Sequence, residues 1–498
     1  MKKQVIRSMA AVAMLFGVVA TAGAQSLPGS GWFTSATIQN VGSAAGTVNL
    51  DVYPLTGVAG TAASASFSLP SGANKVFLPG ANGASGTVDV SPSLSSNFSG
   101  SMVVSSDQPV VAIGQIGNNM IAGVSGLGVT GGYASEQYRG GDAVSPILIY
   151  PTVKSNFNGK TNIFYVQAGG ADVTFAATIK TADGTSHAKN GAITANHSIL
   201  ISPADFAPAI ATTGCGSDPN TSPCFGSLTV TATGGNIVGA EVEFVNGQSP
   251  ATLAQSTSFF PDTEASDTLF CPAFKNAFSA TARFTGIAVA NAGATPVVVN
   301  AVLTESLPTP GVVFNATALT IPAGGSVVYS SQINNVGGLP TNSLAAVKLT
   351  APAGSKLVAV VNESNFSGTI KATTYSCFSA ASTTSKVAVP LFKEDFAGRT
   401  GISIQNVGTA ATTVMAAFSC AAPGTVGNYN LTSPSIAVGA SYTFFDTSAL
   451  AGGPVNGSLC GVTLDGQGQN IVAIAQTSSD FQSPAGLLNT QNYEGFNL

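Results

Sequence analysis

The sequence repeats one short pattern four times, and the spacing of the copies limits the fold more than any other feature. The pattern ends in Asn-x-Gly and is followed by a stretch of alternating apolar residues. Its copies are Ile38–Gly42, the degenerate Val166–Gly170, Val289–Gly293 and Ile404–Gly408. The final glycines fall at 42, 170, 293 and 408, so the repeat lengths are 128, 123 and 115 residues. Repeats of this length are whole domains, because solenoid units span only about 20–50 residues.

Each repeat contains short alternating stretches separated by Pro and Gly turns. Residues 226–244, for example, form two β-branched stretches on either side of a Gly-Gly-Asn turn. This spacing predicts an antiparallel β-sandwich. We interpret Asn-x-Gly as a hairpin turn, because Asn and Gly tolerate a positive φ at least cost. The sequence therefore predicts an all-β chain with four tandem antiparallel β-sandwich domains, spanning residues 25–144, 145–267, 268–385 and 386–498.

Two stretches around the repeated pattern, Thr37–Tyr53 and Ser403–Phe418, resemble a known module. They are similar to the strand-turn-strand of bacterial immunoglobulin-like modules of the cell-adhesion-related (CARDB-like) type. The resemblance implies an immunoglobulin-like sandwich in each domain and an extracellular setting. It transfers no catalytic residue, because the matching positions are turn and core residues.

The first 24 residues have the three parts of a secretory signal peptide. A basic start is followed by the apolar run Met9–Ala20 and by Ala22-Gly23-Ala24, an A-x-A cleavage site. No later stretch approaches the roughly 20 apolar residues of a transmembrane helix. We expect a secreted protein, at the cell surface, in the extracellular space or in the periplasm.

Six cysteines in an exported chain predict up to three disulfides, although six cysteines allow 15 pairings. Metal binding is the alternative, but the sequence has no C-x-x-C pair. Three local pairs are favoured. Cys215 and Cys224 are nine residues apart in one loop, and Cys271 and Cys377 lie at the two ends of the third repeat. Cys420 and Cys460 both lie at inward positions of the fourth repeat.

Only 8% of the residues are charged and the formal net charge is −5, with no basic block. This excludes the electrostatic footprint of a nucleic-acid-binding protein. Neutral faces rich in Ser and Thr repel one another weakly, which favours close packing between molecules. We therefore expect the partners to be other copies of the chain or cell-surface glycans and proteins.

No catalytic motif is recognisable, and we expect neither an enzyme nor a cofactor. The two histidines, His187 and His197, match no metal-binding or triad pattern, and we expect both to be surface polar residues. The densest acidic group is Asp262, Glu264 and Asp267. These three could supply part of a calcium site, and a solvated linker is the alternative.

A second motif, Pro-x-apolar-Lys-x-x-Phe, occurs three times, at residues 151–157, 272–278 and 390–396. Three copies could be the linkers between four domains. Alternatively, they belong to strands of the sandwiches. In that case one terminal domain lacks a strand and presents an open edge, which a neighbouring molecule could fill.

These observations predict a secreted structural or adhesive protein of the bacterial cell surface or matrix, built from tandem sandwiches and able to assemble with itself. A carbohydrate-binding adhesin is the second possibility and requires exposed aromatic platforms that recur among the repeats. A secreted hydrolase is the third and requires perturbed acids near the histidines.

Overall fold

The computed structural model describes residues 12–16, 32–79, 87–95, 98–118, 135–139, 145–246, 254–279, 282–365, 372–396, 398–420, 425–478 and 490–498. These residues form strands and turns, and their helical elements are five three-residue 3-10 turns. The predicted all-β class is therefore confirmed. None of the described helices is long and apolar enough to cross a membrane.

The strands fall into four consecutive sets, which we call units one to four. Unit one contains β1 (Val12–Phe16), β2 (Trp32–Asn40), β3 (Gly46–Pro54), β4 (Ala63–Leu69), β5 (Asn74–Phe77), β6 (Thr87–Val88), β7 (Gly100–Ser106), β8 (Val110–Asn118) and β9 (Ser135–Arg139). Unit two contains β10 (Ile147–Lys154), β11 (Lys160–Ala168), β12 (Val173–Thr181), β13 (Ser186–Ile193), β14 (Ser198–Ile201), η1 (Pro203–Asp205), β15 (Phe225–Thr233), β16 (Ile237–Val245), β17 (Ala254–Ser258), β18 (Phe260–Pro261) and η2 (Asp262–Glu264).

Units three and four follow the same plan. Unit three contains β19 (Thr268–Asn276), β20 (Arg283–Asn291), β21 (Val297–Leu307), β22 (Val313–Asn315), β23 (Leu319–Ile321), β24 (Ser326–Ser330), η3 (Ser331–Ile333), β25 (Ser343–Thr350), β26 (Leu357–Asn365), β27 (Ala372–Ser376), β28 (Phe378–Ser379) and η4 (Ala380–Ser382). Unit four contains β29 (Lys386–Glu394), β30 (Arg399–Asn406), β31 (Met415–Cys420), β32 (Gly427–Thr432), β33 (Ser441–Phe444), η5 (Thr447–Ala449), β34 (Ser458–Asp465), β35 (Ile471–Ser478), β36 (Thr490–Glu494) and β37 (Phe496–Asn497).

Each unit is a sandwich of an outer and an inner sheet. The outer sheets have the orders β1-β7-β3-β4, β18-β10-β15-β12-β13, β28-β19-β25-β21-β22 and β37-β29-β34-β31-β32. The inner sheets have the orders β6-β5-β2-β8-β9, β14-β11-β16-β17, β24-β20-β26-β27 and β33-β30-β35-β36. The pairing is antiparallel throughout these sheets except between β5 and β6.

The three Pro-x-apolar-Lys motifs lie in strands and are not linkers. They belong to β10, β19 and β29, which pair with β15, β25 and β34 of their own units. In each strand the register shifts at the proline, for instance between Cys271 and Phe274. Since proline has no N–H to donate to the ladder, a bulge is the position that accepts it.

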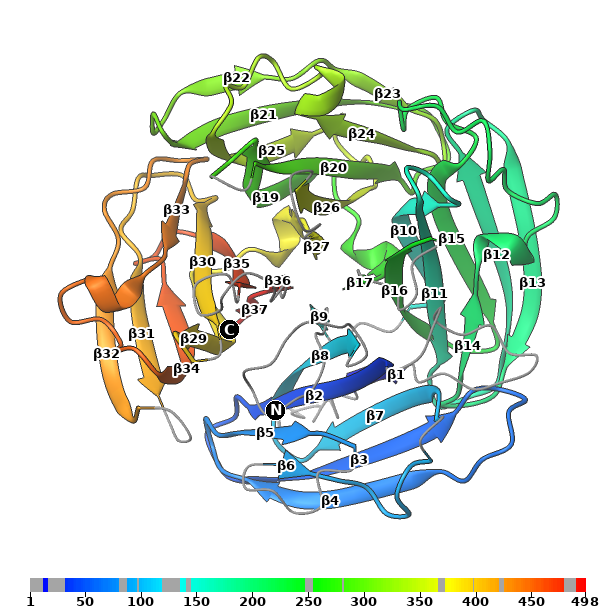
Figure 1. Cartoon of the computed structure of the whole chain (residues 1–498), viewed down its shortest axis with the longest axis horizontal. Helices are drawn as coiled ribbons and strands as arrows, with labels where there is room; N and C mark the ends of the chain where they lie inside the picture. The colour runs from blue at the N-terminus through cyan, green and yellow to red at the C-terminus, as the bar shows by residue number, and fades with distance from the viewer. Residues whose placement is uncertain are drawn as a thin grey trace, which may run out of the picture.

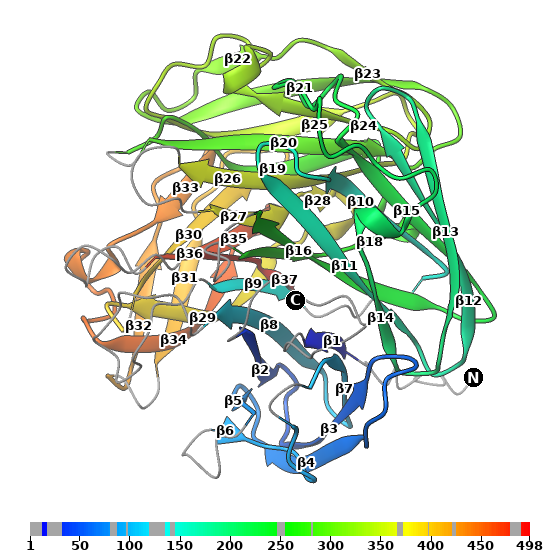
Figure 2. The same cartoon turned by 45° about the vertical axis from the view of Figure 1, so that its right-hand side comes forward.

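The four units form a closed ring, with the inner sheets towards the centre (Figure 1). Figure 2 shows the same arrangement from a second direction. The ring closes because Ile113 of β8 in unit one packs into the hydrophobic core of unit four. In the same way, Val472 and Ile474 of unit four pack into the core of unit three.

Inner-sheet strands are buried on both faces, as β26 illustrates. Its residues Leu357, Ala359 and Val361 belong to the core of unit three, whereas Val358 and Val360 pack into the core of unit two. A strand covered on both sides reads as a continuous apolar run instead of an alternating one. Consecutive apolar residues in these strands therefore mark the contacts between units.

The Asn-x-Gly pattern works differently from the hairpin turn we expected. It follows β2, β20 and β30 and leads from an inner sheet to an outer sheet. The Asn406 side chain is buried, donates to Ala410 O at 2.9 Å and to Ile436 O at 2.9 Å, and accepts from the Gly408 N–H at 3.0 Å. A Cβ on Gly408 would lie 2.9 Å from Gln469 Cβ, a fixed part of that side chain. The position therefore favours glycine for space, and Asn406 is needed for its amide.

Candidate functional site at the ring axis

One strand from each unit lines the centre of the ring. The strands β9, β17, β27 and β36 are the central edges of the four inner sheets, and each lies beside its counterparts in the adjacent units (Figure 1). Described side chains connect them: Thr257 Oγ1 lies 3.2 Å from Ser376 Oγ, and Glu494 accepts from the Ser376 N–H. The axis is therefore a polar junction between edge strands, held partly by side-chain hydrogen bonds.

Buried tyrosines tie two axial strands to the bulges of the proline strands. The Tyr375 hydroxyl donates to Ala273 O at 2.6 Å and accepts from the Ala273 N–H at 3.1 Å. Tyr493 makes the same pair of bonds with Leu391, at 2.5 and 3.0 Å. A bulge leaves backbone groups without a partner in the ladder, and one phenol satisfies both of them.

Unit two places a cluster of charged side chains inside the sandwich, between β10 and the inner sheet. Lys154 Nζ donates to Glu243, and Lys160 Nζ lies 3.2 Å from Glu243 Oε1. Burial alone would raise the pKa of Glu243, but the two lysines outweigh it and lower the pKa. The result is a buried carboxylate held between two cations.

A second buried acid of unit two, Glu241, has no cation directly against it. It accepts hydrogen bonds from Tyr150 Oη at 2.8 Å and from the Asn162 side chain. Burial and the nearby Glu243 raise the pKa of Glu241 to about 8. Glu241 is therefore mostly protonated at neutral pH, and Glu243 carries the negative charge of the cluster.

Unit three repeats the cluster with different partners. Lys275 Nζ lies 2.8 Å from Glu363 Oε2, and Arg283 Nη1 lies 2.9 Å from Glu363 Oε1. Burial opposes ionisation of Glu363, but Lys275 and Arg283 lower its pKa to about 2. Gln476 of unit four also donates to Glu363 at 3.0 Å and accepts from Lys275 at 2.5 Å. The cluster therefore joins two units.

Unit four keeps the lysine but not the acid. Backbone N–H groups of Lys275 and Lys393 bond to Thr285 and Thr400 at 3.0 Å each, so the two lysines hold matching positions. In unit three, Thr285 pairs with Glu363 on the neighbouring strand, whereas in unit four the corresponding Thr400 pairs with Thr477. Thr477 therefore stands at the position of the acid. Burial lowers the pKa of Lys393 to about 8. The Lys–Glu pair is thus a feature of units two and three.

These clusters connect strands of the same sandwich through buried charged side chains. The Glu363 carboxylate, for example, contacts Lys275, Arg283 and Gln476. Removing one partner would strand a buried charge, which is strongly destabilising. The clusters therefore fix the proline strands of units two and three, β10 and β19, against their inner sheets.

A pocket near the axis collects residues from three units, among them Glu264 of unit two, Ser376 of unit three and Glu494 of unit four. It encloses about 30 Å³, which is room for one or two water molecules. The disulfide residue Cys377 lies in its wall.

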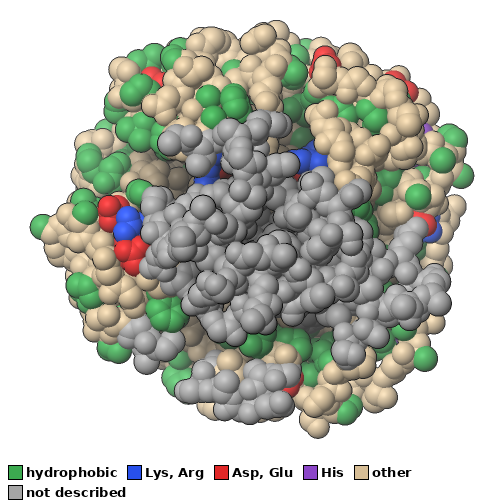
Figure 3. Space-filling model, in the orientation of Figure 1, with side chains coloured by type: hydrophobic (Ala, Val, Ile, Leu, Met, Phe, Trp, Pro, Cys, Tyr) green, Lys and Arg blue, Asp and Glu red, His purple; other side chains and the backbone are tan. Residues whose placement is uncertain are grey.

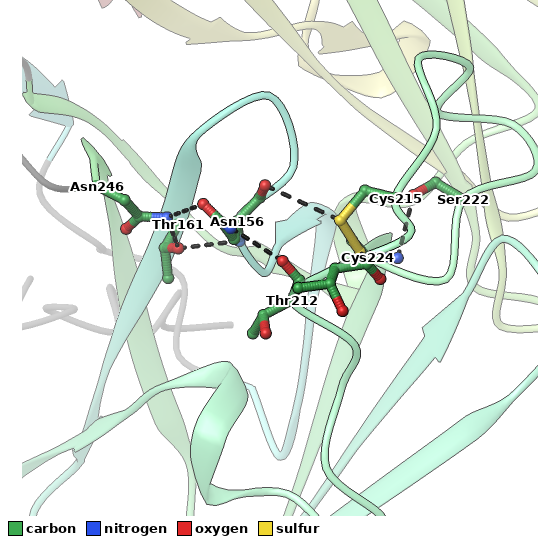
Figure 4. The surroundings of a disulfide bond; sticks show 8 residues. Asn156, Thr161, Thr212, Cys215, Ser222, Cys224 and Asn246 are labelled. Carbon is green, nitrogen blue, oxygen red and sulfur yellow. Dashed lines mark hydrogen bonds between the residues drawn. A yellow bond between two sulfur atoms is a disulfide. The ribbon is translucent and has the colours of Figure 1, made fainter.

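The six cysteines form three disulfides. They join Cys215 to Cys224, Cys271 to Cys377 and Cys420 to Cys460, the local pairs that the sequence favours. Figure 4 shows the first of these, which closes a loop beside Asn156 and Thr161 of the β10–β11 region. The second ties β19 to the residue after β27, and the third links the paired strands β31 and β34.

The three acids of the calcium candidate have separate protein contacts. Asp262 Oδ1 accepts from Ser145 Oγ at 2.6 Å, and Asp267 Oδ2 accepts from the Gly354 N–H at 3.0 Å. Glu264 lines the axial pocket. Within the part of the chain that the structure describes, no group of three His, Cys, Asp or Glu residues is arranged to hold a metal ion.

The histidines lie apart from these clusters, and His187 is not the surface residue we expected. It is buried, with Nδ1 2.7 Å from Pro208 O and Nε2 3.3 Å from Thr181 Oγ1. Thr181 in turn donates to Asp183 at 2.6 Å. In a catalytic triad the histidine lies between hydroxyl and acid, whereas here the hydroxyl lies between them. His197 is half-buried, with Nδ1 2.9 Å from Ala195 O.

The buried lysines and glutamates were not predicted as a group from the sequence. The only sequence signal was the lysine of the second motif, which we read for its spacing and not for its charge. Lys275 and Glu363 lie 88 residues apart in the chain, so only the fold brings them together.

Comparisons with known proteins give little support for any family. No family model and no curated protein matches the chain. A solved structure described as a tetra-tandem repeat in the extending region of a large adhesion protein matches with 13% identity, covering 98% of this chain and 99% of that chain. Its TM-score of 0.12 is too low to carry an argument about fold or function. The immunoglobulin-like resemblance stays a prediction.

Proposed function

We propose that the protein is an exported structural or adhesive protein of the bacterial surface or extracellular matrix, which works through contacts and not through catalysis. The closed ring is the observation that carries this proposal. Each inner sheet packs against both its own outer sheet and the next unit, and unit four returns to unit one. Such a ring holds its peripheral loops and edges in fixed relative positions, as a binding platform requires.

The surface composition supports a role in contact. On the face in Figure 3, charged side chains form small separate groups among uncharged and hydrophobic surface. Four large hydrophobic residues of unit three are 39–54% exposed: Val298 near the start of β21, Leu307 at its end, Val312 just before β22 and Val313 at the start of β22. Val313 begins β22, the edge strand of the outer sheet. An apolar edge strand favours pairing with another chain.

The carbohydrate-binding alternative gains no specific support. It requires an exposed aromatic platform that recurs among the units. Among the large hydrophobic residues that the structure describes as exposed, Phe445 is the one aromatic, and the Arg399 guanidinium lies 5.9 Å from its ring centroid. The adhesive proposal therefore assumes contact with other proteins, for instance through the apolar edge strand β22, and not contact with sugars.

The proposal is tested in the bacterium that makes the protein. Surface fractionation with an antibody should find the protein outside the cytoplasm, and deletion of its gene should lower cell-to-cell or cell-to-matrix attachment. Complementation with V312S/V313S should restore less attachment than complementation with V58S, because Val58 is exposed on unit one and lies outside the β22 edge of unit three. Retention in the cytoplasm, or equal attachment with and without the gene, contradicts the proposal.

A further inference from the structure

The outer sheet of unit one contains a strand that cleavage of the signal peptide would remove. β1 lies within the predicted signal peptide, residues 1–24, and pairs antiparallel with β7. Val12 faces Val104, and Phe16 faces Gly100. The other residues of the predicted signal peptide lie outside the described part of the chain.

β1 occupies the position that β10, β19 and β29 occupy in the other units. In unit two, Leu148 faces Val230 and Val153 faces Gly226. Gly226 corresponds to Gly100, because each pairs on its other side with the last residue of the adjoining strand, β12 or β3. A Cβ on Gly100 or Gly226 would lie 1.9 or 2.2 Å from a carbonyl oxygen of that strand.

The contacts of these strands with the next unit also correspond. β10 lies against β20 and β26 of unit three, and β1 lies against β11 and β16 of unit two. Both strands therefore fill a slot that lies on the inner sheet of their own unit and has two side walls. One side wall is the backbone edge of an outer-sheet strand, and the other is the inner sheet of the following unit.

Contacts that do not involve β1 hold the two walls of the first slot together. Ser101 Oγ donates to Asn196 O at 2.7 Å, and the Thr56 N–H donates to Ser198 O at 2.8 Å. Ile116 of unit one shares a buried apolar cluster with Ile163 and Val242 of unit two. Without β1 the slot would remain, bordered by the β7 edge and an apolar face.

Among the described strands, only β1 pairs with this edge of β7, whose other edge pairs with β3. Only residues 25–31 would precede β2. In units two to four, residues 155–159, 277–282 and 395–398 form the connection between the corresponding strands, so 25–31 is long enough for that connection alone. The Pro-x-apolar-Lys motif occurs three times in the sequence, and all three copies pair within their own units.

We propose that this slot, between β7 and the β11–β16 face of unit two, is a binding site for an extended segment of a different polypeptide chain. The segment adds to β7 as an antiparallel strand, by the pairing seen in β-augmentation. The proposal rests on the proposed export, because cleavage of the signal peptide is what opens the slot.

The three internal strands define the chemistry of the segment. Their sequences are Leu-Ile-Tyr-Pro-Thr-Val-Lys, Leu-Phe-Cys-Pro-Ala-Phe-Lys and Val-Ala-Val-Pro-Leu-Phe-Lys. The slot therefore takes a seven-residue pattern. Its first three positions are apolar, aromatic or cysteine, and its fourth is the proline of the bulge. The fifth position varies, the sixth is apolar and the seventh is lysine. A partner with this pattern near one of its termini could present it without unfolding.

Binding of a synthetic peptide to the purified, oxidised mature chain (residues 25–498) tests the proposal. The probe is a fluorescently labelled peptide with the sequence of residues 147–154. We expect saturable binding at one peptide per chain and a higher Tm. A peptide with the changes Leu148→Asp and Tyr150→Asp should lose about tenfold or more in affinity, because both changes put a charge against apolar walls.

A self-complemented chain is the matched control. It carries residues 147–159 fused directly before Trp32, which reproduces the natural connection between β10 and β11. This chain has its slot filled and should neither bind the peptide nor gain stability from it. A mature chain that folds only when the peptide is present supports the proposal equally.

Three results would overturn the proposal. The first is equal peptide binding by the mature and self-complemented chains, or none by either. The second is a mature chain that dimerises while the self-complemented chain stays monomeric, which makes a second copy the occupant. The third is an exported protein whose N-terminus precedes residue 12, since its slot would then be filled. Failure of the peptide assay leaves the surface and attachment results standing, so the two proposals can fail separately.

Discussion

Replacing Glu363 by Gln should destabilise unit three strongly and in a pH-dependent way. The carboxylate is buried and lies 2.8 Å from Lys275 Nζ and 2.9 Å from Arg283 Nη1. Its two cations lower its pKa from 4.5 to about 2, although burial opposes them. At about 1.4 kcal/mol per pKa unit, this shift corresponds to about 3 kcal/mol. The substitution also leaves the buried Lys275 and Arg283 without their anionic partner, and loss of such a partner destabilises a protein by a similar amount.

The sign of the pH dependence follows from the direction of the shift. Because the folded pKa of Glu363 lies below its unfolded value of 4.5, the stabilisation is complete above pH 4.5 and is lost as the pH falls towards 2. The wild type should therefore exceed E363Q by about 3 kcal/mol at pH 7, and the difference should shrink between pH 4.5 and 2.

Hydrogen exchange measured by mass spectrometry is the suitable assay, because a four-unit chain does not unfold in one step. Peptides from β26 report the free energy of opening locally. D465N is the control: Asp465 pairs with Lys386 at 3.4 Å, but the Lys386 side chain is 58% exposed, so this change should cost less than about 1 kcal/mol. Equal losses for E363Q and D465N, or a loss for E363Q that does not vary with pH, would refute the reasoning.

Three further changes probe other parts of the fold. Because burial raises the pKa of Glu241 from 4.5 to about 8, its contribution is complete below pH 4.5 and lost as the pH rises through 8. In hydrogen exchange of β16, E241Q should match the wild type at pH 4 and be more protected than the wild type at pH 9. Y375F leaves the Ala273 N–H without its phenol acceptor, and exchange of β27 should show a loss of about 1–3 kcal/mol. The double variant C420S/C460S removes a crosslink between residues 40 positions apart, and exchange of β31 and β34 under oxidising conditions should show a loss of about 4 kcal/mol.

The strand content and the repeat were predictable because they depend on local pattern. Alternation along β12 and β31 reports one buried face, and the repeat spacing reports the size of a unit. The disulfides could also be predicted from the sequence. Cys420 and Cys460, for example, lie at inward positions of two strands, and these strands pair directly. Each of these features involves residues close in sequence or on one strand face.

Other features are undecided or wrongly predicted from the sequence because their reason lies in distant contacts. The proline motifs were compatible with linkers until pairing with β15, β25 and β34 placed them in sheets. The sequence predicts a positive φ for the glycine of Asn-x-Gly, whereas the constraint at Gly408 is close contact with Gln469, 61 residues later in the chain. The sequence around His187 does not indicate that its side chain is buried against Thr181 and Pro208.

The positions of strands and the number of repeats follow from the amino-acid sequence alone, because alternation and turn residues act over a few positions. The closure of the four units into a ring, the contact between Lys275 and Glu363, and the pairing of β1 with β7 become visible only in the folded chain. These depend on which faces meet after folding. The apolar runs of the inner strands show that a second face is covered, but not which unit covers it.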